Sequence, residues 1–245
     1  MIYAILMGRK GSQGFPGKNL YPVLGKPLAY YPMEVSKQCP EIDQSYLSTD
    51  DEQLMGLAKE NDIEIIERPP ELCTAEALGE DVYIHAHKII KERNPSKTIE
   101  LIVLLMCNAA TISSKLISEG IKTLKEHPDY DSAVSVSRYN MWSPLRARKE
   151  NKEGLLDPFV PFETFGDPKT LNCDRDSQGD VWFADMGVSI IRPQNLETIE
   201  SGLLPQKWMG QRIHPLKQWG GLDVDYEWQI PQVEYWLEKH GRVDL

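Results

Sequence analysis

Cysteine, long apolar runs and positive charge are all scarce in this chain. Its 245 residues include four cysteines, with no C-x-x-C pair and no histidine beside any of them, which excludes the common structural zinc patterns and a disulfide scaffold. We therefore expect free, buried thiols at Cys39, Cys73, Cys107 and Cys173. No apolar run approaches the ~20 residues that span a bilayer, and the first residues lack the pattern of a targeting segment. These absences predict a cytoplasmic protein with no membrane partner.

Lysine and arginine number 27 against 37 aspartates and glutamates, a formal net charge of -10. Because nucleic acids and anionic membranes attract basic surfaces, this balance argues against both as partners. Hydrophobic residues make up 41% and charged residues 26%, as in an ordinary globular protein. The length is sufficient for one α/β domain over residues 1–245 with its own core.

Strand-like and helix-like segments alternate through the first half of the chain. The patterns predict strands at 2–7, 45–48, 63–67, 101–106 and 131–137, and helices at 28–37, 49–61, 74–90 and 113–127. In this scheme Thr49, Thr74 and Ser113 begin three of the helices, and 101–106 is the central strand. The order predicts a mostly parallel, twisted, Rossmann-like sheet with helices on both faces. Ligands of such sheets bind at the carboxyl ends of the strands.

The pattern changes after Arg138. Residues 139–180 are rich in proline, aspartate, aromatic and basic residues and show no clean period. We interpret them as an inserted segment, either a lid or a dimerisation contact. Regular structure is expected again at 181–191, followed by a strand at 222–224 and a helix at 231–240.

A glycine-rich loop, GRKGSQGFPGKN, follows the first predicted strand. Glycine tolerates left-handed backbone and lets a ligand approach closely, so such a loop can turn its N–H groups onto phosphate oxygens. Arg9 and Lys18 would add charge-assisted hydrogen bonds. The spacing matches neither the dinucleotide fingerprint nor the P-loop. The alternative is a glycine-rich turn with solvated cations.

A carboxylate pair lies near the other end of the chain, in Gly220-Gly221-Leu222-Asp223-Val224-Asp225. On an extended strand, residues two apart point to the same face, and two carboxylates suit Mg²⁺ held together with substrate phosphates. A solvated pair is the alternative. A phosphate loop and a carboxylate pair in one α/β chain together favour metal-assisted nucleotidyl transfer.

The loop from Gly8 to Leu20 resembles the A-R-x-G-S-K-G-x-P-x-K-N-L signature of the acylneuraminate cytidylyltransferases, the enzymes that make CMP-sialic acid and related CMP-nonulosonic acids, which are related to the CMP-Kdo synthetases. Four further matches follow in order. They are Leu47-Ser48-Thr49-Asp50 with S-T-D, Arg68-Pro69-Pro70-Glu71-Leu72 with R-P-x-x-L, Asp131 to Val136 with D-S-x-x-S-V, and Asp223-Val224-Asp225 with the metal-binding D-x-D. The resemblance thus extends over most of the chain.

The resemblance implies a nucleotide-diphospho-sugar transferase fold, a homodimer, and transfer of CMP from CTP to a small acidic sugar with release of pyrophosphate. Arg9 and Lys18 would hold the triphosphate, and Asn19 the base or ribose. Asp223 and Asp225 would hold Mg²⁺. Together with Arg9 and Lys18 they would form the catalytic set. The remaining nucleotide-binding positions would be Met7, Gly8, Gly11, Ser12 and Arg68.

The sequence departs from the family pattern mainly where the acceptor would bind. Gln13 replaces a lysine of the loop, Met106-Cys107-Asn108-Ala109-Ala110 stands for Q-P-T-S-P, and Phe183-Ala184-Asp185-Met186-Gly187 stands for Y-R-x-N-G. The positions expected at the acceptor are Met106, Asn108, Arg175 and Met186. Three hypotheses stay open: an acceptor of the 2-keto-3-deoxy acid class other than ordinary sialic acid, CTP-dependent transfer to another sugar or a phosphonate, or a nucleotide-binding protein that has lost transferase activity.

Overall fold

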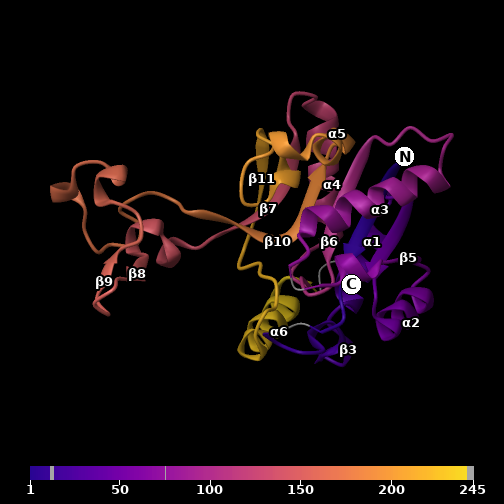
Figure 1. Cartoon of the computed structure of the whole chain (residues 1–245), viewed down its shortest axis with the longest axis horizontal. Coiled ribbons are helices and arrows are strands. Elements are labelled where there is room, and N and C mark those ends of the chain that lie inside the picture. The colour runs from indigo at the N-terminus through magenta and orange to yellow at the C-terminus, as the bar shows by residue number, and fades with distance from the viewer. Residues whose placement is uncertain (12–13, 75, 242–245) are drawn as a thin grey trace.

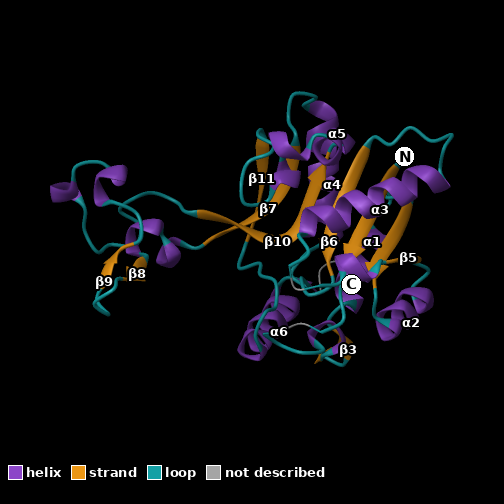
Figure 2. Ribbon diagram, in the orientation of Figure 1, coloured by secondary structure: helices purple, strands orange, loops and turns teal. Residues whose placement is uncertain are grey.

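A seven-stranded sheet forms the centre of the computed structural model, which describes residues 1–11, 14–74 and 76–241. Its order is β11 (Ile213–Gln218), β7 (Ser132–Arg138), β10 (Trp182–Ile191), β6 (Leu101–Met106), β1 (Ile2–Met7), β4 (Gln44–Thr49) and β5 (Glu64–Glu67) (Figures 1 and 2). Strand β10 runs antiparallel to both of its neighbours, and the other pairs are parallel. The mostly parallel sheet is confirmed, and β6 is its central strand.

Helices cover both faces of this sheet. One face packs against α1 (Tyr30–Gln38), α2 (Glu52–Glu60) and α4 (Ser114–Glu126), and the other against α3 (Gly79–Arg93) and α5 (Pro193–Glu197). Alternate residues of β1 serve the two cores: Ala4 and Leu6 lie in the first, and Tyr3 and Ile5 in the second. Because both faces are covered, β1 and β6 read as continuous apolar runs.

Two helix starts depend on side-chain caps. Ser113 begins α4 as predicted, since its Oγ accepts a hydrogen bond from the Leu116 amide at 3.3 Å. The predicted cap of α2 was wrong: Asp51, and not Thr49, accepts from the Gln53 amide, at 2.9 Å. Thr49 is the last residue of β4 and is fully buried there, so the chain turns into the helix two residues later.

Two other predicted elements were wrong. Helix α3 begins at Gly79 rather than Thr74, after a short 3₁₀ helix η2 (Pro70–Leu72), and Leu78 at its start provides no side-chain cap. The predicted strand at 222–224 is a loop, and the strand that completes the sheet is β11, parallel to β7.

A third apolar cluster joins the two ends of the chain. Helix α6 (Ile230–Lys239), which follows η9 (Glu227–Gln229), packs Val233 and Trp236 against Phe15 and the hairpin of β2 (Pro22–Val23) and β3 (Lys26–Pro27). Val224, fully buried, belongs to the same cluster. This packing brings the loop that contains Asp223 and Asp225 beside the loop that follows β1.

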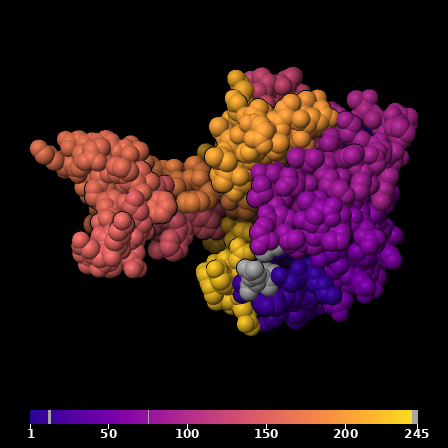
Figure 3. All heavy atoms as spheres, viewed as in Figure 1, coloured from indigo at the N-terminus to yellow at the C-terminus, as the bar shows by residue number. Residues whose placement is uncertain are grey.

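Residues 139–180 leave the sheet between β7 and β10 and extend away from the body as an arm (Figures 1 and 3). The arm contains a small hairpin, β8 (Arg148–Glu150) and β9 (Leu156–Pro158), and the 3₁₀ helices η3 (Asn140–Trp142), η4 (Pro144–Arg146), η5 (Phe162–Phe165) and η6 (Pro168–Thr170). Three further 3₁₀ helices, η1 (Lys18–Leu20), η7 (Ile199–Ser201) and η8 (Lys207–Met209), lie in the body. Across the part of the chain that the structure describes, no helix is both long and apolar enough to traverse a bilayer.

Candidate active site

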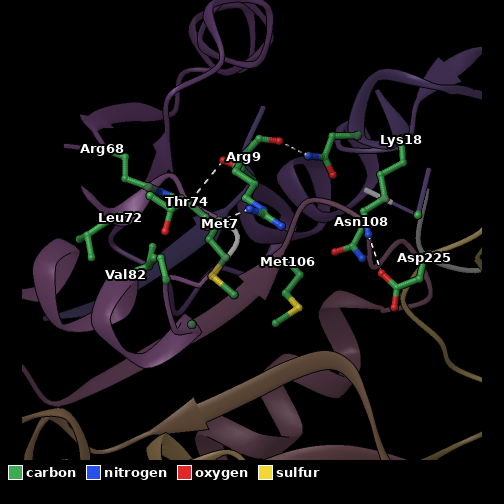
Figure 4. Close-up of a pocket in the computed structure, with 15 residues that line it drawn as sticks. Met7, Arg9, Lys18, Arg68, Leu72, Thr74, Val82, Met106, Asn108 and Asp225 are labelled. Carbon is green, nitrogen blue, oxygen red and sulfur yellow. Dashed lines mark hydrogen bonds and ion pairs between the residues drawn. The ribbon is translucent and has the colours of Figure 1, made fainter. Parts of the chain in front are cut away.

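A cavity of about 370 Å³ opens at the carboxyl ends of β1 and β6 (Figure 4). Arg68, Leu72 and Val82 lie at one end of it, and Lys18, Asn108 and Asp225 lie at the other. Arg9, Met7 and Met106 line the middle. Apart from the buried Arg68, apolar side chains line the first end, which we call the apolar end, and the Lys18–Asp225 ion pair lies at the second, which we call the charged end. The position of the cavity is the one at which parallel sheets bind their ligands.

Lys18 links the two loops at the charged end. Its Nζ donates to Asp225 Oδ1 and to the Val224 carbonyl, each at 2.6 Å, and its side chain is 11% exposed. Gly17, in left-handed backbone at φ +73°, precedes it and begins η1. Gly14 permits the close approach of the loops, because a Cβ there would lie 2.8 Å from the Asp225 carbonyl oxygen. The loop is thus shaped to hold one cation against the carboxylate segment.

Arg9 lies across the middle of the cavity. Its Nη1 donates to the Thr74 carbonyl at 2.9 Å. Asn19 is buried, and its amide donates to the Arg9 carbonyl at 3.4 Å, which holds the loop under the guanidinium. Asn19 also lines the cavity, so it can position Arg9 and face a ligand.

Arg68 is 6% exposed and bonds mainly to backbone. Its Nη2 donates to the carbonyls of Ser48, at 2.8 Å, and Gly8, at 3.3 Å, so it ties together the ends of β4 and β1. Burial lowers the pKa of its guanidinium from the ordinary value. Arg68 therefore supports the strand ends and contributes positive charge to the apolar end of the cavity.

Asp223 and Asp225 lie in a loop and not on the predicted strand. Asn108 holds this loop through two hydrogen bonds to the backbone of Val224. Its side-chain amide donates to the Val224 carbonyl at 2.9 Å, and its backbone carbonyl accepts from the Val224 N–H at 2.9 Å. Asn108 also donates to Asp223 Oδ2 at 3.4 Å. Burial, and then the nearby charge of Asp225, raises the pKa of the Asp223 carboxyl, while Lys18 opposes the rise. Two carboxylates are thus crowded together beside one ammonium.

The four positions expected at the acceptor are not all brought together. Met106 and Asn108 line the cavity, although the Asn108 amide is engaged by Val224. Met186 does not line it: it lies half-buried in the irregular part of β10, at φ +61°, and packs against the core beneath α3. Arg175 lies in the arm, where its Nε donates to Asp176 at 3.3 Å.

Two positions that were predicted to bind the nucleotide are not placed at the cavity by the structure. Gly11 is exposed and does not line the cavity, whereas Ser12 lies outside the described residues. Sequence analysis missed the wall made by Leu72, Thr74 and Val82. The signal available for it was the R-P-x-x-L match, which ends at Leu72.

Across residues 1–11, 14–74 and 76–241, no group of three or more His, Cys, Asp or Glu side chains could hold a metal ion by itself. A cation at Asp223 and Asp225 would therefore need further ligands from water or from a bound substrate. That is the usual arrangement for Mg²⁺ at a nucleotide.

The family model described as Cytidylyltransferase matches residues 3–153, from β1 into the arm. The N-acylneuraminate cytidylyltransferase of Escherichia coli is 30% identical over 144 residues, which cover 59% of this chain and 33% of that protein. The protein of the same name from Oncorhynchus mykiss is 23% identical over 233 residues, which cover 94% of this chain and 49% of that protein. The chain thus spans between about a third and a half of the length of these relatives.

Two solved structures are similar over nearly the whole chain. A CMP:2-keto-3-deoxy-manno-octonic acid synthetase complexed with CTP matches with a TM-score of 0.66 at 14% identity, covering 97% of this chain and 98% of that one. A 4-diphosphocytidyl-2C-methyl-D-erythritol synthase from Anaerococcus prevotii matches with a TM-score of 0.60 at 12% identity, covering 97% and 96%. These likenesses confirm the predicted nucleotide-diphospho-sugar transferase fold.

Proposed function

Because this chain belongs to the cytidylyltransferase family, we propose that it transfers CMP from CTP to the anomeric hydroxyl of a 2-keto-3-deoxy sugar acid and releases pyrophosphate. The observation that carries the proposal is the convergence of Arg9, Lys18 and Asp225 on one cavity at the ends of β1 and β6. The acceptor class rests on the curated relatives, which are N-acylneuraminate cytidylyltransferases.

The two ends of the cavity suit the two ends of CTP. The triphosphate would lie between Arg9 and Lys18, where charge-assisted hydrogen bonds to phosphate oxygens are available. The base would lie at the apolar end, between Leu72 and Val82 and near Arg68, because a flat base has apolar faces and polar edges. Lys18 pairs with Asp225 in the free protein, so bound phosphate would compete with that carboxylate for the ammonium.

The transfer is an in-line displacement at the α-phosphorus. The anomeric oxygen of the acceptor forms a bond to this phosphorus, and the bond from phosphorus to the oxygen bridging the β-phosphate breaks. The electron pair of that bond leaves with pyrophosphate, and the hydroxyl proton passes to solvent. Arg9 and Lys18 would stabilise the negative charge on the phosphate oxygens, and their fixed positions avoid reorganisation during the reaction.

The carboxylate loop fits a divalent cation. Burial and the charge of Asp225 disfavour the ionised form of Asp223, and a cation held by these two residues would favour that form. Asp223 and Asp225 would hold Mg²⁺ together with phosphate oxygens of CTP. When bound, Mg²⁺ supplies charge neutralisation at the transferring phosphate.

A second candidate is the same CTP chemistry with a different acceptor, such as another sugar or a phosphonate. Two observations favour it. Met106 presents a thioether to the cavity where the family pattern has glutamine, and the Asn108 amide is already engaged by Val224. An acceptor with fewer hydroxyl groups at this position would fit such a surface better than sialic acid.

We also propose that the arm contacts a second copy of the chain. It extends away from its own body, and several large apolar side chains on it are 58–70% exposed: Met141, Trp142, Leu156 and Phe159. Exposed apolar groups concentrated on one projection are typical of an interface. Light scattering at micromolar concentration tests this proposal, and a monomeric mass would contradict it.

Thermal unfolding with Mg²⁺ and each of CTP, UTP, ATP and GTP tests the nucleotide assignment. At ~100 times its dissociation constant a ligand stabilises by about 2.7 kcal/mol, which is about 5–10 °C for a chain of this length. We expect this shift with CTP and smaller shifts with the others. Pyrophosphate release is then measured with nine-carbon and eight-carbon 2-keto-3-deoxy acids, other sugars and phosphonates. The absence of a shift with CTP would contradict the proposed function, and release with a phosphonate alone would favour the second candidate.

A further inference from the structure

A buried carboxylate lies beneath the loop of residues 219–225. Asp185, in the irregular part of β10, is 4% exposed. Four donors surround it: Oδ1 accepts from Ser135 Oγ at 2.5 Å and the Gly187 amide at 3.2 Å, and Oδ2 accepts from Ser137 Oγ at 2.6 Å and Gln218 Nε2 at 2.9 Å. These donors come from β7, β10 and β11, so the carboxylate joins three strands.

This group has no charged partner. Within the described part of the chain, no lysine, arginine or histidine forms an ion pair with Asp185. Moving a carboxylate out of water costs several kcal/mol unless its oxygens are hydrogen-bonded. Here each oxygen accepts two hydrogen bonds, which uses its lone pairs fully. An asparagine or a serine could not accept from all four donors.

Two chains of hydrogen bonds lead from Asp185 to the loop. In the first, Ser137 Oγ donates to Asp185 and accepts from the Gly221 amide at 2.8 Å. In the second, Gln218 Nε2 donates both to Asp185 and to the Thr111 carbonyl, at 3.0 Å. Thr111 Oγ1 then accepts from the Leu222 amide at 2.8 Å and donates to the Leu222 carbonyl at 3.0 Å. The first chain ends at Gly221 and the second at Leu222, the residue directly before Asp223.

Gly221 packs directly on the carboxylate. A Cβ at this position would lie 2.4 Å from Asp185 Oδ2 and 2.4 Å from Gln218 Nε2. The hydroxyl of Tyr139, the first residue of the arm, donates to the Gly221 carbonyl at 2.7 Å. The loop is therefore held from below by Asp185 and from the side by the root of the arm.

We propose that Asp185 is a positioning residue: by fixing Gln218 and Ser137 it holds the 219–225 loop so that Asp223 and Asp225 face Lys18 and the triphosphate. The catalytic effect of the loop position rests on the proposed function, but the contacts that fix the loop do not depend on it. Displacing catalytic groups by about 1 Å can cost a factor of 10² in rate. A small displacement of this loop is therefore expected to reduce turnover while leaving the fold intact.

Two variants and one control test the proposal. Asp185→Asn keeps the size of the side chain, but whichever way its amide lies, its nitrogen meets a donor, either the Gly187 amide or the amide of Gln218. Gln218→Met keeps the length of the other partner and removes the bridge to Thr111, so the test does not depend on Asp185→Asn folding. Asp180→Asn is the matched control, because Asp180 is a half-exposed carboxylate at the root of the arm, paired with Arg138 at 3.2 Å.

Hydrogen exchange measured by mass spectrometry is the readout that does not require activity. We expect exchange in residues 219–225, which contain the Gly221 and Leu222 amides, to become at least tenfold faster in both variants, with β1 and β6 unchanged. We also expect kcat to fall at least tenfold and the KM for CTP to change less, because Arg9 is held by Thr74 and is not displaced with this loop. The control is expected to behave as wild type in both measurements.

Two results would overturn the proposal. One is exchange in 219–225 within twofold of wild type in both variants. The other is a lower melting temperature with no selective exchange in this loop and an unchanged kcat, which would make Asp185 a structural residue only. If the wild type itself neither binds nor uses CTP, the proposed function fails, and the exchange measurement still decides whether Asp185 fixes the loop.

Discussion

Replacing Lys18 by methionine separates binding from stability more cleanly than any other change at this site. Methionine keeps an apolar stem of similar length, so the packing of the side chain is largely retained. The substitution removes the ammonium that donates to Asp225 Oδ1 and to the Val224 carbonyl, both at 2.6 Å. The stability of the variant then depends on the lost bonds to Asp225 and Val224, whereas its CTP affinity depends on the lost bond to phosphate.

The loss of stability is expected to be small. The Asp225 side chain is 58% exposed, and ion pairs with an exposed partner contribute about 0–1 kcal/mol. The Val224 carbonyl keeps a second donor, the Asn108 amide, at 2.9 Å. We therefore expect the free energy of unfolding to fall by no more than about 1 kcal/mol, or about 4 °C in melting temperature.

The loss of CTP affinity is expected to be much larger. A hydrogen bond between a charged donor and a phosphate contributes about 1.5–3 kcal/mol, equivalent to about 10–150-fold in the dissociation constant. Titration calorimetry with CTP at constant Mg²⁺ measures this change, and thermal unfolding measures the first one.

Lys26→Met is the matched control. Lys26 belongs to the neighbouring hairpin, where its ammonium lies over the Tyr30 ring, and it does not line the cavity. Its CTP affinity is expected to equal that of the wild type. The reasoning is refuted if folded Lys18→Met binds CTP within threefold of the wild type. It is also refuted if the melting temperature falls by well over 4 °C while affinity is retained.

Four other perturbations have expected outcomes. Asp225→Asn should keep the melting temperature within a few degrees and lower pyrophosphate release at least 100-fold; near-normal turnover would exclude it as a metal ligand. Burial lowers the pKa of His87, so the free energy of unfolding should fall as pH drops below about 6.5, where the unfolded chain binds the proton more strongly; His87→Gln should flatten this slope in urea titrations. At pH 7.5 a maleimide should label exposed Cys173 within minutes and spare Cys107, whose burial raises its pKa to about 12; equal labelling would contradict the packing. Gly8→Ala would place a Cβ 2.9 Å from Cys107 Sγ, and should cost about 1–3 kcal/mol by denaturant unfolding; an unchanged midpoint would disagree with this contact.

Sequence patterns were sufficient for the elements buried on both sides. The prediction for 2–7 and 101–106 matches β1 and β6 at both ends, because each is a continuous apolar run with helices on both faces. Free, buried thiols were expected at every cysteine. This holds for Cys39 and Cys107, but Cys73 is only partly buried and Cys173, on the arm, is exposed. The arm offers little core in which to bury a side chain.

The errors come from elements whose position is set by distant contacts. Strand β11 lies at the edge of the sheet, where only Leu216 of its six residues is buried and Pro215 is tolerated, so no alternating pattern marks it. The segment 222–224 has the composition of a strand, but Val224 packs into the cluster under α6 and not into the sheet. Ser135 and Gly187 lie in segments that the sequence analysis compared with family motifs, but nothing local to either segment shows that both donate to Asp185.

The two halves of the site differ in the same way: one depends mainly on local sequence, and the other on contacts between distant segments. Most of the proposed nucleotide end, including Arg9, Lys18 and Asn19, comes from the single loop after β1, although Arg68, Val82 and Asp225 complete it from other segments. The positions expected at the acceptor lie on separate elements: Met106 at the tip of β6, Met186 in the irregular part of β10 and Arg175 in the arm. Of these three, Met106 alone lines the cavity, beside the residues proposed to hold CTP. The proposed change of acceptor therefore rests mainly on Met106, and the acceptor panel tests the half of the site that family membership leaves open.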